Sequence, residues 1–313
     1  FWRFVALVAT SKLMLILGAT GFLGSFVVKQ MLAEGYAIRV LTRGADDWKD
    51  SSVVDLRHKG VDVVIGEVTD SDALSGALDQ VAAVVNMVGC FSEKKGASFD
   101  ELHVGLLENL IELGTAKGVK RLIHVSCLGA SEDSEGPYYQ SKWEGEELIR
   151  ESKLYWTIFR PSFMFGERFP LFAYLKPLLT FRLFLPIIGS GTNTLAPVYV
   201  NDVASCVSQC IYQRQTVGQS YDLVGPEEYS MLELLEMARK HLGLKGPTMN
   251  IPSKFTGSTF DMVSKAIPRA LLTKDLASFM SEDSCAPQDV MLRHFEVRNV
   301  SLEQCFGKIM ESL

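Results

Sequence analysis

The sequence lacks a long uninterrupted apolar segment. Its longest apolar stretch, residues 171–188, is broken by Lys176, Pro177, Arg182 and Pro186, whereas a membrane-spanning helix needs about 20 consecutive apolar residues. The sequence therefore predicts no transmembrane helix. Basic residues are also in deficit, with 31 Lys and Arg against 37 Asp and Glu and a net charge of −6. Because nucleic-acid-binding proteins usually present a basic face, we exclude nucleic acid as the main partner.

Cysteine is scarce and scattered. The six cysteines show neither a C-x-x-C motif nor the His–Cys spacing of a metal site; they are Cys90, Cys127, Cys206, Cys210, Cys285 and Cys305. The sequence therefore predicts reduced thiols, with no disulfide framework and no metal site. Internal repeats are absent as well, so a chain of 313 residues is expected to bury one large core plus a smaller appended region.

The first glycine-rich turn carries the strongest functional signal. Leu13–Leu17 are five consecutive apolar residues, which predict a strand buried on both faces of a parallel sheet. Gly18, Gly21 and Gly24 follow, and the apolar residues after them recur at helical spacing. A helix N-terminus offers free backbone N–H groups and a positive dipole end to a diphosphate. The pattern predicts a dinucleotide-binding site, with a glycine-rich turn that binds no ligand as the alternative.

Strands and helices alternate along the first 160 residues. We expect strands at residues 13–17, 37–42, 61–65, 82–88, 121–125 and 156–159, and helices at 71–78, 99–116 and 139–151. Capping boxes at Ser98–Glu101 and Ser230–Glu233 mark two helix starts. The alternation predicts an α/β fold with a doubly wound parallel Rossmann sheet, which binds ligands at the carboxyl ends of its strands.

Three regions are expected along the chain. Residues 1–12 form an N-terminal extension, which is too short to span a bilayer. Such a short segment is consistent with what remains after a targeting sequence is cleaved. Residues 13–160 form an NADP(H)-binding Rossmann domain. Residues 161–313, where proline and aromatic residues become frequent, form a smaller C-terminal α/β lobe that is partly interleaved with the Rossmann core.

The end of the second expected strand predicts which dinucleotide binds. NAD sites usually carry an acidic residue there for the ribose hydroxyls, but this sequence has Thr42 and Arg43. Because a guanidinium pairs well with a 2′-phosphate, these residues favour NADP(H). The alternative is a surface Arg43, with Asp46 or Asp47 reaching back to bind NAD.

Other strand ends are placed to contact the cofactor. Glu67 and Val68 follow the third strand, where such folds pass the adenine. Asn86 and Gly89 begin and end the segment after the fourth strand, where the backbone passes the diphosphate and the nicotinamide ribose. We add three candidate cofactor-binding residues after the sixth strand, namely Pro161, Ser162 and Phe163.

A Tyr–Lys pair is the candidate catalytic group. Tyr138 and Lys142 are four residues apart, which places both side chains on one helix face. Because a nearby ammonium stabilises a phenolate, we expect a lowered pKa for Tyr138 and a role in acid–base catalysis of hydride transfer. Lys142 can also hold the nicotinamide ribose. The hydroxyl that should polarise a substrate carbonyl is doubtful, because the chain offers Ser126 and then Cys127, and a thiol is a poor donor.

Together these features resemble the short-chain dehydrogenase/reductase superfamily, in its extended or atypical branch. Further segments narrow the resemblance to the Rossmann-fold accessory subunits of mitochondrial respiratory complex I, of the alpha subcomplex subunit 9 type. Those segments are Leu122–Ser126 with Leu128–Ala130, Arg160–Ser162 with Met164–Gly166, Pro197–Val200 with Asp202 and Val203, Leu223–Pro226 with Tyr229, Leu272–Asp275 and Val300–Glu303. The resemblance extends from Leu13 to Leu302.

The resemblance implies a tightly bound NADPH and no established turnover. By position, the implied cofactor residues are Gly18, Thr20, Gly21, Phe22, Leu23, Gly24, Arg43, Tyr138 and Lys142. It also implies a place on the matrix side of the mitochondrial inner membrane, beside other complex I subunits near the quinone-binding region, with peripheral membrane contact. The missing hydroxyl donor fits a cofactor that is held rather than consumed.

Three functions are therefore weighed. The leading hypothesis is an NADPH-binding accessory subunit of complex I without independent activity. A free NADP-dependent reductase or epimerase of the same superfamily and a dinucleotide-sensing regulator are the alternatives, because one fold hosts all three. For the accessory subunit, the aromatic residues of 161–188 with Lys176 and Arg182 predict a surface that meets a membrane or a partner subunit. Burial inside the lobe's own core is the alternative.

Overall fold

The chain divides into two compact units. The first consists of residues up to Pro161 together with 201–222 and 290–297, and the second of 162–200, 223–289 and 298–313. The computed structural model describes residues 13–44, 51–90, 93, 98–134, 136–167, 179–180, 184–251 and 283–311. Several predictions concern residues outside this described part, namely those on 1–12, on Asp46 and Asp47, and on most of 171–188.

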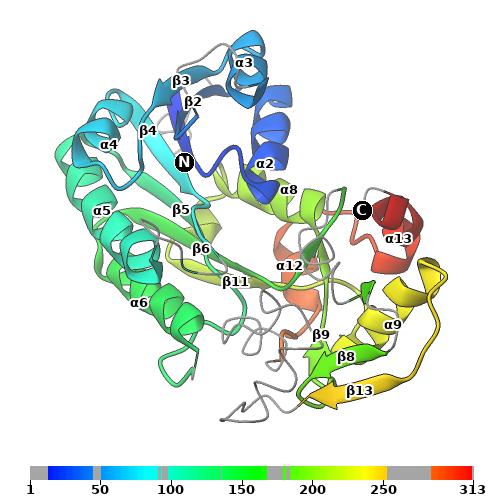
Figure 1. The fold of residues 1–313 in the computed structure, drawn as a ribbon. Helices are drawn as coiled ribbons and strands as arrows, with labels where there is room; N and C mark the ends of the chain where they lie inside the picture. Colours follow the sequence, from blue (N-terminus) through cyan, green and yellow to red (C-terminus); the bar gives the residue numbers. More distant parts are fainter. Residues whose placement is uncertain are drawn as a thin grey trace. The chain divides into compact units, whose positions relative to one another are not determined.

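The first unit is built on a seven-stranded sheet (Figure 1). Its strands are β1 (Leu13–Leu17), β2 (Ala37–Thr42), β3 (Asp62–Ile65), β4 (Val81–Asn86), β5 (Arg121–Val125), β6 (Tyr155–Pro161) and β11 (Gln219–Leu223), in the spatial order β11-β6-β5-β4-β1-β2-β3. The pairs β1–β2, β2–β3, β1–β4, β4–β5 and β5–β6 are parallel. The predicted α/β fold with a parallel Rossmann sheet is therefore confirmed.

Helices accompany the strands of this sheet. In chain order they are α2 (Phe22–Ala33), α3 (Ser51–His58), α4 (Ser71–Ala77), η1 (Asp100–Gly105), α5 (Leu106–Ala116), α6 (Pro137–Glu151), α8 (Val200–Cys210), η2 (Arg214–Thr216) and α12 (Asp289–His294). The helix expected at 99–116 begins with a π-helical segment, η1, before it continues as α5. Its capping box is present, because Ser98 and Glu101 each accept a hydrogen bond from the other's backbone N–H. The π-helical turn is a local irregularity that the apolar pattern did not predict.

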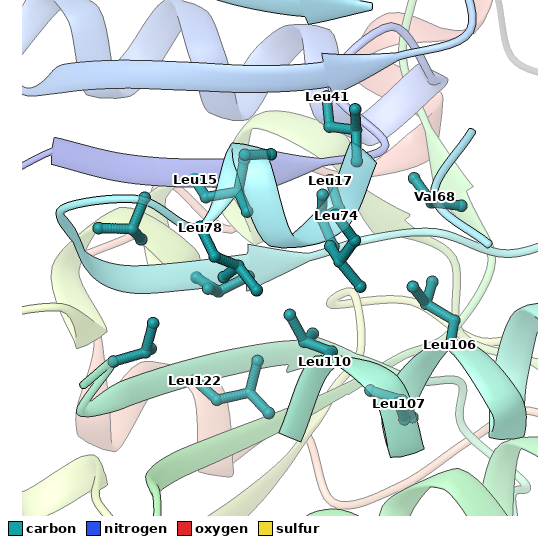
Figure 2. Packing of buried hydrophobic residues seen from close by; sticks show 14 of the residues in the cluster. Leu15, Leu17, Leu41, Val68, Leu74, Leu78, Leu106, Leu107, Leu110 and Leu122 are labelled. Carbon is teal, nitrogen blue, oxygen red and sulfur yellow. The ribbon is translucent and has the colours of Figure 1, made fainter. Parts of the chain in front are cut away.

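One face of the sheet packs against α4, α5 and α6 (Figures 1 and 2). Leu15 and Leu17 of β1 point into this cluster, which also contains Leu41, Leu74, Leu78, Leu106, Leu107, Leu110 and Leu122. Met14 and Ile16 are equally buried and face the opposite side, because side chains alternate along a strand. On that side α8 is tied to the end of α2 by a hydrogen bond from Ser208 to the carboxylate of Glu34. Helices on both faces explain why β1 is apolar throughout.

A buried arginine connects the sheet to chain that follows residue 200. Arg121 of β5 is 1% exposed, and its guanidinium donates to the carbonyl oxygen of Tyr155 at 2.8 Å and to the hydroxyl of Thr157 at 2.5 Å. The same group donates to the carbonyl oxygen of Cys210 and to the hydroxyl of Thr216, both at 3.1 Å. Because a buried guanidinium needs many acceptors, this arrangement holds α8 and η2 against the sheet.

The second unit has its own small core. Its strand pairs are β7 (Met164–Phe165) with β10 (Val198–Tyr199), β9 (Thr194–Leu195) with β12 (Tyr229–Ser230), and β8 (Leu185–Ile188) with β13 (Thr248–Ile251). Two helices, α9 (Met231–His241) and α13 (Leu302–Glu311), pack on the same apolar cluster. The predicted capping box of Ser230 and Glu233 is present at the start of α9.

The described part of the apolar stretch 161–188 packs into this core. Phe165, Leu185 and Ile187 are buried there, and Phe163 and Phe184 pack against them. For Phe165, Leu185 and Ile187 the prediction of a membrane or partner surface is wrong, because their side chains are buried within the unit. For the half-buried Phe163 and Phe184 it stays a prediction. Among the described helices, none combines the length and the apolar character needed to cross a membrane.

Candidate dinucleotide-binding site

The glycine turn joins β1 to α2 where the strand ends. Gly18 adopts a positive φ of 81°, which favours glycine, and a Cβ atom there would lie 2.9 Å from the backbone of Met87. A Cβ atom at Gly24 would lie 2.1 Å from the carbonyl oxygen of Gly18. The turn therefore requires glycine at both positions, because α2 packs directly on the end of β1.

The N-terminus of α2 is available to an anion. Gly21 is the N-cap residue, no side chain caps the helix, and the first turn carries no acidic residue. Thr20 and Gly21 are exposed, whereas Phe22 is half-buried and Leu23 is buried. Uncapped backbone N–H groups at a positive dipole end suit a diphosphate. The predicted phosphate-binding residues thus gather at one helix end.

The ends of β2 and β3 carry two exposed charges. The side chain of Arg43 is 72% exposed and that of Glu67 is 60% exposed, and the Nε of Arg43 lies 4.0 Å from the Oε2 of Glu67. Thr42 and Val68 are buried, so they support this edge rather than present side chains to solvent. Glu67, predicted to lie near the adenine, therefore also stands beside the guanidinium predicted to bind the 2′-phosphate.

The end of β4 is held by a buried asparagine. Asn86 is fully buried; its Oδ1 accepts from the backbone N–H of Val88 at 3.1 Å, and its Nδ2 lies 3.3 Å from the Nδ1 of His124. Burial lowers the pKa of His124 well below its usual value, so its imidazole is neutral. Asn86 therefore shapes the segment that leads to Gly89. A Cβ atom at Gly89 would lie 3.0 Å from the Nζ of Lys142, so glycine makes room for the amine.

Tyr138 and Lys142 lie on α6 beside this segment. Lys142 is only 4% exposed, and its amine lies 3.5 Å from the carbonyl oxygen of Val88. Burial lowers the pKa of Lys142. The pKa of Tyr138 is raised well above its usual value by burial, with a further contribution from Cys127, which hydrogen-bonds to the phenol. The expected lowering of the Tyr138 pKa is therefore wrong, because burial outweighs any stabilisation of the phenolate by the ammonium.

The segment that follows β5 offers Tyr138 a thiol. Burial raises the pKa of the Cys127 thiol to about 12, so this partner of the phenol is a neutral thiol. Ser126 is buried, and within the described part of the chain its hydroxyl has no hydrogen-bond partner. The usual polarising hydroxyl is replaced by a thiol, which is a weak donor.

His103 is a site residue that the sequence did not predict. It lies in η1, is 2% exposed, and its ring is stacked on Phe99 and set edge-on to Tyr138. Its Nε2 lies 3.4 Å from the backbone nitrogen of Cys90, and its Nδ1 lies 2.9 Å from the hydroxyl of Ser141. A single histidine in an amphipathic helix gives no sequence signal, and only the π-helical turn marks the position as unusual.

The three remaining candidates divide between the two units. Pro161 ends β6 in the first unit, and its carbonyl oxygen accepts from the backbone N–H of Leu128 at 3.0 Å. Ser162 and Phe163 belong to the second unit. There the hydroxyl of Ser162 lies 2.8 Å from the carbonyl oxygen of Ser284, and Phe163 packs on the apolar cluster.

The fold and the glycine turn define a nucleotide-binding protein of the Rossmann class. Residues 18–168 match the NAD(P)H-binding family model, which supports a nicotinamide dinucleotide as the ligand of this region. Solved structures support the fold. A nucleoside-diphosphate-sugar epimerase from Staphylococcus aureus superposes with a TM-score of 0.71 at 20% identity, covering 95% of this chain and 99% of its own. A triphenylmethane reductase of a Citrobacter species, solved with NADP(H), gives a TM-score of 0.69 at 17% identity over 96% and 100%.

The sequence relatives are more specific. The chain is homologous to the mitochondrial "NADH dehydrogenase [ubiquinone] 1 alpha subcomplex subunit 9" of Arabidopsis thaliana, with 30% identity over 71% of this chain and 56% of that protein. The mouse protein of the same name is 29% identical over 71% and 59%. The mitochondrial "NADH-ubiquinone oxidoreductase 40 kDa subunit" of Neurospora crassa is 26% identical over 83% and 68%. The chain thus spans little more than half the length of the plant and mouse relatives.

Proposed function

We propose that this chain is an NADPH-binding accessory subunit of mitochondrial respiratory complex I that holds its dinucleotide without turning it over. The observation that carries the proposal is the mismatch within the site. The glycine turn at Gly18–Gly24 is intact, whereas Tyr138 has a raised pKa and a thiol, Cys127, as its partner. Such a phenol can hydrogen-bond to a bound cofactor, but it is a poor acid–base group for hydride transfer at neutral pH.

The preference for NADPH over NADH rests on the end of β2. Arg43 is exposed and free to turn toward a 2′-phosphate, with which a guanidinium forms paired hydrogen bonds. Glu67 lies 4.0 Å away and offers a carboxylate of the kind that binds ribose hydroxyls in NAD sites. We assign the 2′-phosphate contact to Arg43, because it continues directly from β2.

The partners follow from the relatives. Proteins named as complex I subunits in a plant, a fungus and a mammal match this chain. The proposal places the chain in mitochondria, peripherally on the matrix side of the inner membrane, beside other complex I subunits near the quinone-binding region. The surface that contacts these subunits is formed by residues other than Phe165, Leu185 and Ile187, which are buried.

Two measurements test the proposal. Native gels of membranes solubilised with a mild detergent should show the chain co-migrating with NADH dehydrogenase activity, and calorimetry on the purified chain should show tight binding of NADPH. A chain that migrates alone, or that binds neither dinucleotide, contradicts the proposal. The Arg43→Ala variant should bind NADPH more weakly and still co-migrate with the complex. That result would show that cofactor binding and assembly are separate properties.

The retained Tyr138–Lys142 pair favours one second candidate, a free NADP-dependent reductase. Both side chains lie on α6 beside the residue 86–90 segment, where a nicotinamide would be placed. Steady oxidation of NADPH by a carbonyl compound, abolished by Tyr138→Phe, would establish that function. Stoichiometric retention of NADPH without oxidation supports the accessory subunit.

A further inference from the structure

The segment that follows β4 is held between η1 and α6 at several points. On one side the Nε2 of His103 lies 3.4 Å from the backbone nitrogen of Cys90. On the other side the amine of Lys142 lies 3.5 Å from the carbonyl oxygen of Val88. Gly89 lies between them, because a Cβ atom there would be 3.0 Å from the Lys142 amine and 3.4 Å from His103 Nε2. A side chain at this position would crowd the Lys142 amine and shift it by a few tenths of an ångström.

The hydrogen bonds of His103 assign its tautomer. The hydroxyl of Ser141 donates its single proton to the carbonyl oxygen of Tyr138 at 2.9 Å, so it accepts from the Nδ1–H of His103. The Nε2 then carries the lone pair that accepts from the N–H of Cys90. A neutral imidazole therefore uses both nitrogens, one toward α6 and the other toward the segment after β4.

The surroundings keep His103 neutral. Burial, together with the positive charge of Lys142 and the proximity of His124, lowers the pKa of His103 to about 2. A histidine with this pKa neither gains nor loses a proton near neutral pH, so it does not act in acid–base chemistry there. Its two hydrogen bonds make it a connecting group instead.

The helices approach closely around the same residue. A Cβ atom at Gly145 of α6 would lie 2.3 Å from the carbonyl oxygen of His103, so the two backbones are in contact. The π-helical turn sets His103 between α6 and the segment after β4, and π-helical turns are often found at functional sites. The contact and the tautomer together give His103 a fixed position relative to Lys142.

We propose that His103 is a positioning residue for the nicotinamide half of the bound dinucleotide. It fixes the backbone of residues 88–90, and that backbone in turn fixes the Lys142 amine that holds the nicotinamide ribose. The adenosine half, which contacts the ends of β2 and β3, does not depend on it. The inference rests on the proposed binding of NADPH.

The test compares two ligands that share the adenosine half. NADPH contains the nicotinamide ribose, whereas adenosine 2′,5′-bisphosphate lacks it. His103→Ala should weaken NADPH binding about tenfold, the expected cost of one or two lost hydrogen bonds, and leave the affinity for the bisphosphate within about twofold. His103→Gln keeps a donor and an acceptor and should restore NADPH binding to within about threefold of the wild type.

The control is Leu110→Ala, which removes a buried side chain of α5 that belongs to the apolar cluster. It should lower the melting temperature as His103→Ala does, yet leave the ratio of the two affinities unchanged. A loss of affinity for both ligands in His103→Ala, or for neither, overturns the inference while the proposed function stands. A wild-type chain that binds the bisphosphate but not NADPH overturns both.

Discussion

The adenosine end and the nicotinamide end of the candidate site differ in how their charges meet water. At the adenosine end, Arg43 and Glu67 stand exposed at the edge of the sheet, 4.0 Å apart. At the nicotinamide end, Lys142 and Glu146 are almost fully buried. Exposed charges are screened and contribute little to folding, whereas buried ones are stable only with matched partners. Substitutions at the adenosine end should therefore change the ligand preference without changing stability. Substitutions at the nicotinamide end should also destabilise the fold.

The buried carboxylate of Glu146 gives the largest expected effect. It is fully buried one turn after Lys142, and it accepts from Arg150 at 2.5 Å and from Arg160 at 2.6 Å. Glu146→Ala should lower the free energy of unfolding by about 3 kcal/mol, because two half-buried guanidinium groups, those of Arg150 and Arg160, lose their shared buried carboxylate. Glu147→Ala, which removes a half-exposed partner of Arg150, should cost less than about 1 kcal/mol. Urea titrations of both variants measure the difference, and equal losses would contradict the contrast between buried and exposed charges.

His103 provides a pH test of the buried end. Its folded pKa of about 2 lies below the unfolded value of about 6.5, so the unfolded chain takes up the proton first. The associated stability is present above about pH 6.5 and is lost as the pH falls toward 2. Between pH 7 and pH 5 the wild type should lose about 2 kcal/mol more than His103→Gln. His124 is common to both proteins and cancels in the comparison. Parallel curves of unfolding free energy against pH would show that His103 titrates normally.

Arg43→Ala tests the exposed end. The variant should weaken NADPH binding about tenfold or more, because a charge-assisted pair with the 2′-phosphate is lost. NADH has no 2′-phosphate, so its affinity should stay within about twofold. The melting temperature should not change, since the side chain is 72% exposed. Calorimetric titration with both dinucleotides gives the ratio, and similar losses for the two would refute the assignment.

Glu67→Gln is expected to have the smallest effect. The carboxylate of Glu67 lies 4.0 Å from the Arg43 guanidinium and competes with a phosphate for it. Its removal should strengthen NADPH binding by about twofold to threefold, the value of one exposed charge pair. The gain should vanish in the Arg43→Ala background. A gain that persists there would mean that Glu67 repels the phosphate directly.

The elements that the sequence predicted are those specified by a short local pattern of residues. Leu13–Leu17 and Gly18–Gly24 define the first strand and its turn without reference to distant residues, and five more strands of the sheet follow from similar runs. Helix α3 was not predicted, because a short and largely polar segment such as Ser51–His58 carries weak periodicity. The place of β11 at the edge of the sheet was also missed, since pairing with β6 depends on chain far from it in sequence.

The candidate site was predicted less completely than the fold. Residue types and spacing singled out Tyr138 and Lys142, but the rise in the Tyr138 pKa comes from burial, which spacing does not reveal. His103 acts through contacts with Cys90 and Ser141, which belong to two other elements. Contacts of that kind arise only when the helices are packed.

The hydrogen bonds of Arg121 have a consequence for the order in which the chain folds during synthesis. The guanidinium lies on β5, yet two of its acceptors, Cys210 and Thr216, are made about ninety residues later. Until those residues leave the ribosome, the sheet lacks both these acceptors and its β11 edge. The dinucleotide-binding unit is therefore completed late. The glycine turn, Tyr138 and Lys142 have all been synthesised well before the unit that holds them is complete.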